Sequence, residues 1–151
     1  MENFKIQNFE KANPGKRFPV YTVQDEHACA DLVNVLSKKL GIEPSSDGVK
    51  MVQEIQKQAI LLKNVNAESE DFDLSGVLKR ENIKALERVF INWYRFDAID
   101  AMAFQDLSKC FGDVWYPSSD DIEIFDASTN WMLCVAHNGI VKLWMNSQGE
   151  R

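Results

Sequence analysis

Apolar residues in the first half of the chain recur at helical spacing in two places. Between residues 25 and 40 they fall at every fourth position and Gly41 follows as a stop signal, so we predict a helix over 25–40. The repeating positions are Ala28, Leu32, Leu36 and Leu40. A second amphipathic pattern predicts a helix over 48–63, and a shorter helix is predicted over 75–86.

The remaining segments before residue 112 carry weaker signals. Residues 1–21 contain two proline turns and predict an extended arm, and the acid-rich residues 64–74 predict a polar loop. The pattern at 88–96 fits either a helix or a strand. We favour a strand there because the segment is rich in aromatic and β-branched residues. A short helix is predicted over 103–111.

The last thirty residues have the pattern of antiparallel strands. Ile122 and Ile124 alternate with Asp121 and Glu123, which predicts a strand with one apolar face and one acidic face. Further on, Asn138-Gly139 separates two apolar runs and is a strong hairpin signal. A two-residue turn at this point would place Leu133 opposite Trp144. It would also gather the following side chains on one apolar face: Met132, Cys134, Ala136, Val141, Leu143 and Met145.

These elements together predict one domain of the α+β class spanning residues 1–151. Residues 1–21 would form the arm and residues 22–87 a mainly helical part. Residues 88–146 would form the sheet portion with one short helix. The expected architecture has N-terminal helices packed on a three- to four-stranded antiparallel sheet that ends in the Asn-Gly hairpin.

Charge is distributed unevenly along the chain. Residues 97–126 hold eight acids and one base, residues 1–96 hold 14 acids and 14 bases, and the whole chain has a net charge of −6. The pI near 4.9 argues against general nucleic-acid binding, which needs a basic surface. The longest apolar run, 131–136, is too short to span a membrane, and the first residues lack a signal-peptide pattern. We therefore predict a cytoplasmic protein.

Neither the histidines nor the cysteines form a recognisable catalytic or metal-binding motif. The three cysteines have no metal-type spacing, and Cys134 falls on the predicted apolar face, where a thiol is inert. Among the acids, Asp120 and Asp121 could bind a metal or divide acid and base roles, but adjacent strand residues point to opposite faces. We predict a protein that is not an enzyme and needs no cofactor or metal. A small carboxylate-based metal-binding or hydrolytic domain remains the alternative.

An aromatic pair beside the acids has the composition of a protein-binding surface. Trp115 and Tyr116 precede Pro117 in a predicted turn, and exposed aromatic residues next to charge are typical of interface hot spots. A localised acidic surface of this kind favours a basic protein partner. The predicted partner-binding residues are Asp113, Trp115, Tyr116, Asp120, Asp121, Glu123 and Asp126.

Residues 115–126 read Trp-Tyr-Pro-Ser-Ser-Asp-Asp-Ile-Glu-Ile-Phe-Asp, and Trp131 and His137-Asn-Gly139 follow. This C-terminal part resembles small acidic bacterial immunity proteins of polymorphic or contact-dependent toxin systems. The resemblance implies a protein that binds a cognate toxin and blocks its active site. An acidic surface would suit the basic cleft of a nucleic-acid-directed toxin. A regulatory interaction domain unrelated to toxins is a further alternative, and the oligomeric state stays open.

Overall fold

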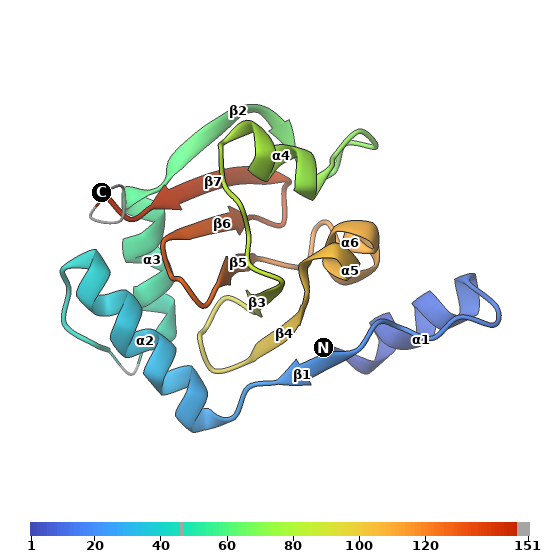
Figure 1. Ribbon diagram of the computed structural model, residues 1–151, viewed down its shortest axis with the longest axis horizontal. Coiled ribbons are helices and arrows are strands. Elements are labelled where there is room, and N and C mark those ends of the chain that lie inside the picture. The colour runs from blue at the N-terminus through green and yellow to red at the C-terminus, as the bar shows by residue number, and fades with distance from the viewer. Residues whose placement is uncertain (46, 148–151) are drawn as a thin grey trace.

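A seven-stranded antiparallel sheet forms the centre of the molecule (Figure 1). The structure is a computed structural model that describes residues 1–45 and 47–147. The strand order is β1-β4-β3-β5-β6-β7-β2, and every neighbouring pair is antiparallel. The strands are β1 (Tyr21–Val23), β2 (Ile60–Asn66), β3 (Arg88–Asn92), β4 (Ile99–Ala103), β5 (Ile122–Asp126), β6 (Trp131–Val135) and β7 (Ile140–Met145).

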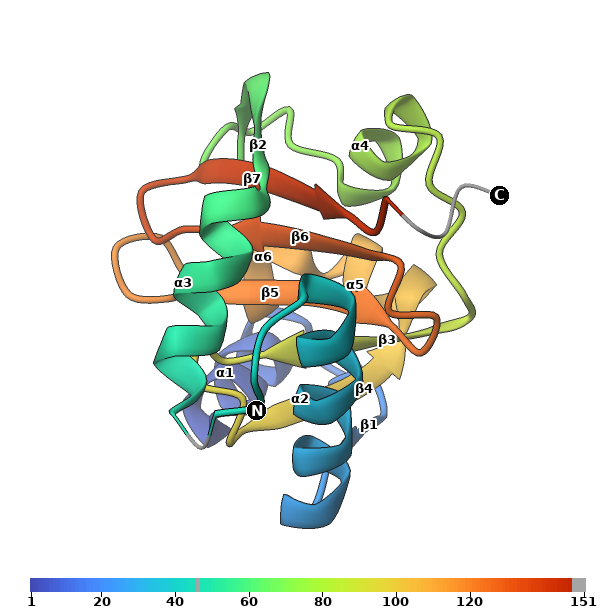
Figure 2. The ribbon, with the colours of Figure 1, turned by 90° about the vertical axis from the view of Figure 1, so that its left-hand side faces the viewer.

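Helices cover both faces of this sheet. The six helices of the described residues are α1 (Asn3–Ala12), α2 (Glu26–Leu40), α3 (Gly48–Gln58), α4 (Leu74–Arg80), α5 (Phe104–Lys109) and α6 (Phe111–Val114). Helices α2 and α3 pack on one face, which Figure 2 turns toward the viewer, and the other helices pack on the opposite face. Each face has its own hydrophobic core, so side chains on both sides of the central strands are buried.

The α+β class agrees with the sequence pattern, but the predicted number of strands was wrong. Three strands were missed: β1, β2 and β4. Strand β2 begins where the predicted helix 48–63 was expected to continue, because α3 ends at Gln58. It lies at the sheet edge with only Leu62 fully buried, so its sequence shows no alternation. Strand β4 reads Ile-Asp-Ala-Met-Ala, and the Asp and Ala residues have low strand propensity.

The helix predictions were correct where residues next to the helix ends specify where the helix starts and stops. Helix α2 starts after Asp25, whose carboxylate accepts a hydrogen bond from the Ala28 N–H, and ends at Gly41 with a left-handed φ of 71°. The predicted arm at residues 1–21 was wrong, because α1 occupies most of its first half. Among the side chains of α1 only Lys5 is buried, and its ammonium contacts Asp120 and the Val114 carbonyl. That contact is with distant residues and is invisible to local sequence patterns.

The hairpin at Asn138-Gly139 exists, but its predicted register was off by one residue. The Ala136 carbonyl accepts from the Gly139 N–H, and Gly139 has a φ of 85°, so the loop has three residues and a bulge. Leu133 therefore pairs with Leu143 and not with Trp144. Since both faces of the sheet are covered, both sets of hairpin side chains contribute to a core.

Candidate functional site

Half of the acidic side chains in segment 97–126 lie in the interior of the protein. Four of its eight acids are buried, with exposed fractions of 9% or less: Asp100, Asp120, Glu123 and Asp126. Asp97 is exposed, and Asp106, Asp113 and Asp121 are half-buried. The localised acidic surface predicted from the sequence therefore includes at most half of these carboxylates, because folding places the other half inside the molecule.

Asp126 stabilises a turn of the backbone. Its carboxylate accepts hydrogen bonds from the Leu86 and Ser128 N–H groups and from Trp131 Nε1, at 2.9–3.0 Å. It is 1% exposed, so the prediction that it binds a partner does not agree with its position. These N–H donors satisfy the Asp126 carboxylate inside the protein, so it needs no external cation.

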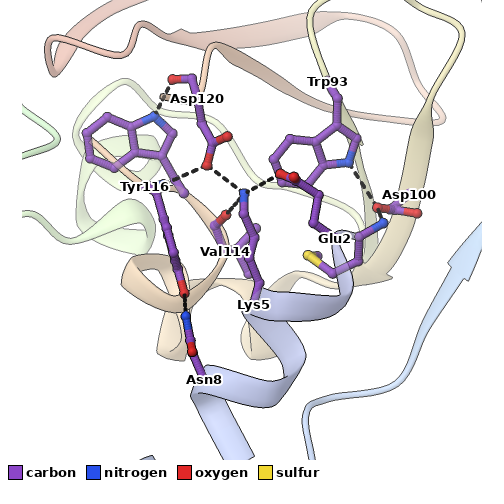
Figure 3. A network of polar contacts seen from close by, with 10 residues as sticks. Glu2, Lys5, Asn8, Trp93, Asp100, Val114, Tyr116 and Asp120 are labelled. Carbon is purple, nitrogen blue, oxygen red and sulfur yellow. Dashed lines mark hydrogen bonds and ion pairs between the residues drawn. The ribbon is translucent and has the colours of Figure 1, made fainter. Parts of the chain in front are cut away.

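Asp120 pairs with the only lysine buried in the described chain (Figure 3). Lys5 Nζ lies 2.5 Å from Asp120 Oδ2 and 2.8 Å from the Val114 carbonyl oxygen, and its side chain is 0% exposed. The ammonium also lies 4.2 Å from the ring centroid of Trp93 and 5.0 Å from that of Tyr116. Helix α1 is thus attached to the sheet by a desolvated cation inside an acidic and aromatic cage.

The predicted aromatic anchors divide between the interior and the surface. Trp115 is 2% exposed, and its Nε1 donates to the Asp120 backbone oxygen at 2.9 Å, so it cannot serve as an exposed anchor. Tyr116 is half-buried, and its hydroxyl accepts from the Asn8 side chain at 3.1 Å. The sequence placed both residues in an open turn, but helix α1 covers that turn from a distant part of the chain.

The loop between β3 and β4, residues 93–98, is held in an unusual backbone conformation. Tyr94 and Phe96 have left-handed φ values of 71° and 56°, which cost energy for residues with a side chain. The Phe96 N–H donates to the Asn92 side chain at 2.8 Å, and the Phe96 ring is buried in the core beneath α2 and α3. Tertiary contacts therefore hold this β3–β4 loop in one shape.

Glu123 also stabilises the β3–β4 loop, through hydrogen bonds to its carboxyl group. Asn92 Nδ2 donates to Glu123 Oε1 at 2.6 Å, and the Tyr94 N–H also hydrogen-bonds to this carboxyl. The pKa of Glu123 is raised to about 8, mainly by burial; the charge of Asp121 adds to the rise, and the two hydrogen bonds oppose it. Glu123 is therefore largely a neutral acid at pH 7. The prediction that it projects from an outer acidic face was wrong, because α2 and α3 cover that face.

Two hollows lie on either side of the β3–β4 loop. The first, called the acidic hollow here, measures about 460 Å³, and its walls include Glu2, Trp93, Tyr94, Ala98, Asp120 and Asp121. The second lies against α2 and measures about 610 Å³. Its walls include Glu26, Cys29, Asn34, Arg95, Phe96 and Asp97. The loop thus separates two concave surfaces of a size that can accept side chains of a partner.

Among the acids predicted to bind a partner, Asp121 has the position that best suits this role. It is half-buried at the rim of the acidic hollow, and its Oδ1 accepts from the His137 N–H at 2.8 Å. The same oxygen lies 3.0 Å from His137 Nδ1. The other histidine, His27, lies on the exposed face of α2 and contacts Asp31 at 3.5 Å.

The cysteines have raised pKa values. Burial raises the pKa of Cys110 to about 11 and raises those of Cys29 and Cys134 as well. All three are buried and free, and a protonated buried thiol is a poor nucleophile. Among the described residues, no three His, Cys, Asp or Glu side chains converge in a way that could hold a metal ion.

The β3–β4 loop also packs closely on the start of α3, and this contact is testable. A Cβ atom added at Gly48 would lie 1.5 Å from the Arg95 backbone oxygen, so backbone must shift. We expect Gly48→Ala to lower the free energy of unfolding by about 1–3 kcal/mol in urea unfolding. Gly112→Ala is the matched control, since a Cβ there meets nothing within 4 Å. Equal stability of the two variants would contradict this packing.

Sequence patterns missed the residues that build this site. Trp93 and Tyr94 were predicted to belong to the strand at 88–96. Nothing in the sequence around Asn92 or Lys5 indicated a functional role. A run of aromatic residues followed by Arg95 and Asp97 could have suggested a loop, but left-handed residues without glycine have no sequence signature.

Comparisons with protein-family models, with curated proteins and with solved structures found no match to this chain. In the part of the chain that the structure describes, no helix has the length and apolar character needed to cross a membrane. The function is therefore inferred from the geometry around the β3–β4 loop.

Proposed function

We propose that this chain is a non-catalytic binding protein that recognises a basic protein partner through the β3–β4 loop and the two hollows beside it. One observation carries the proposal: the loop has two strained residues, yet buried side chains hold it in a single shape between two concave surfaces. Strain of this kind collects at functional sites, where the rest of the fold supports it.

The side chains that the loop presents suit protein recognition. Trp93 and Tyr94 are half-buried, and Arg95 and Asp97 are exposed. A loop already fixed in its shape loses little conformational entropy on binding, and aromatic residues beside charge are typical interface anchors. Asp97 on the loop and Asp121 beside it leave carboxylates at the surface that favour a basic partner.

The resemblance of residues 115–126 to immunity proteins makes the proposal more concrete. On this basis the partner is the basic catalytic domain of a bacterial toxin, and the chain neutralises it in the cytoplasm by covering its active site. Buried Glu123 of the acidic segment then maintains the shape of the binding loop, and Asp97 and Asp121 contact the toxin.

A toxicity-rescue assay tests this function. We expect the wild-type chain to protect cells that express the toxin encoded beside it, and the double variant Tyr94→Ala with Asp97→Asn to protect poorly. At low salt, loss of the Asp97 charge should slow association with the purified toxin by roughly tenfold.

The control is a double variant that removes two carboxylate charges from a distant exposed loop, Glu68→Gln with Asp71→Asn. This control should protect as well as wild type. Full protection by the Tyr94 and Asp97 variant would contradict the assignment of the loop. Absence of protection by the wild-type chain would contradict the immunity function itself.

A further inference from the structure

The acidic hollow contains more negative charge than the chain neutralises. Asp120 is paired with Lys5, and the α-ammonium of Met1 in the wall of the hollow is paired with Asp100, but the carboxylates of Glu2 and Asp121 are less well paired. Glu2 lies 3.6 Å from the same lysine with a 57% exposed side chain. Asp121 contacts a backbone N–H and an exposed histidine ring. Among the described residues, no second lysine or arginine forms an ion pair with either of them.

One aromatic wall of the hollow, Trp93, already contacts a cation. Lys5 is completely desolvated, and besides Asp120 and a backbone carbonyl its ammonium contacts the ring of Trp93 at 4.2 Å. Trp93 also forms a wall of the acidic hollow, together with Tyr94. The chain therefore uses a carboxylate and an aromatic ring to hold a cation directly beside the hollow (Figure 3).

We propose that the acidic hollow is a receptor for one arginine side chain of the protein partner, and this inference rests on the proposed function. The guanidinium would lie against Trp93 and Tyr94 and donate to the carboxylates of Glu2 and Asp121. Arginine fits better than lysine because its planar group stacks on aromatic rings and its N–H groups reach two carboxylates at once. About 460 Å³ is ample for one such side chain.

A titration followed by NMR tests the site without the partner. The probe is N-acetyl-arginine-N-methylamide, and the readouts are the indole N–H of Trp93 and the backbone N–H of Tyr94. We expect both signals to shift and saturate with a Kd on the order of millimolar, which is typical for one isolated side chain. The neutral isostere N-acetyl-citrulline-N-methylamide should cause no such shift.

The variant Glu2→Gln with Asp121→Asn should raise the Kd at least fivefold, and the matched control Glu68→Gln with Asp71→Asn should leave it unchanged. Equal binding of the citrulline probe, an unchanged Kd in the first variant, or shifts confined to other surfaces would overturn the proposal. Such a result would leave the rescue assay unaffected. Conversely, failed rescue with normal arginine binding would reject the toxin partner and keep the site.

Discussion

Replacing Lys5 with alanine is expected to lower the free energy of unfolding by about 3–5 kcal/mol. The side chain of Lys5 is 0% exposed, and its ammonium pairs with Asp120, which is 10% exposed at the side chain. Removal of the lysine leaves a carboxylate in a desolvated site without its cation. The aromatic contacts with Trp93 and Tyr116 are lost at the same time. Urea unfolding at pH 7 measures the change.

Lys11 offers a control on the same helix. It is exposed on α1 and no ion pair involves it in the described structure, so Lys11→Ala should change stability by no more than about 0.5 kcal/mol. The double variant Lys5→Met with Asp120→Asn should recover part of the loss, because no unpaired charge remains. If Lys5→Ala were as stable as Lys11→Ala, the buried ion pair would not be what attaches α1 to the sheet.

Replacing Glu123 with glutamine is expected to remove a marked pH dependence of stability. Burial raises the pKa of Glu123 from 4.5 to about 8 in the folded protein. Between these values the folded protein binds more protons than the unfolded chain, so its stability falls as the pH rises. The slope is about 1.4 kcal/mol per pH unit in the middle of this window and disappears above pH 8.

Glutamine has the same shape, still accepts hydrogen bonds from Asn92 and Tyr94, and does not ionise. The Glu123→Gln variant should therefore match wild type near pH 4.5 and exceed it by a few kcal/mol at pH 9. Urea unfolding at pH 5, 7 and 9 gives the comparison. Asp97→Asn, at an exposed position, should leave the wild-type slope unchanged. Parallel pH profiles of wild type and Glu123→Gln would show that Glu123 is not a buried neutral acid.

The candidate site was only partly accessible from the sequence. Asp97, Asp120 and Asp121 of the acidic segment do line the two hollows of the proposed binding surface. Glu123 was misplaced because an alternating strand was assumed to have one face in water. Asp126 lies on the same side of β5 as Ile122 and Ile124, and its burial among N–H donors was not predicted. A sheet covered on both faces buries the polar positions as well, and each buried carboxylate must then find donors.

Local signals in the sequence were enough to determine several elements. Helix α2 has its own cap residues, and Asn138-Gly139 specifies a turn between two apolar runs. These elements depend on residues a few positions apart, so neighbouring side chains decide them.

Tertiary structure alone decided the rest. Strand β4 exists because β1 and β3 pair with it, and the hairpin register depends on one left-handed glycine. Whether a carboxylate of the acidic segment faces water or the core depends on distant partners, as for Asp120, which Lys5 reaches across 115 residues of chain. The sequence therefore determines the charge of this segment, whereas tertiary packing determines which of its acids remain exposed to a partner.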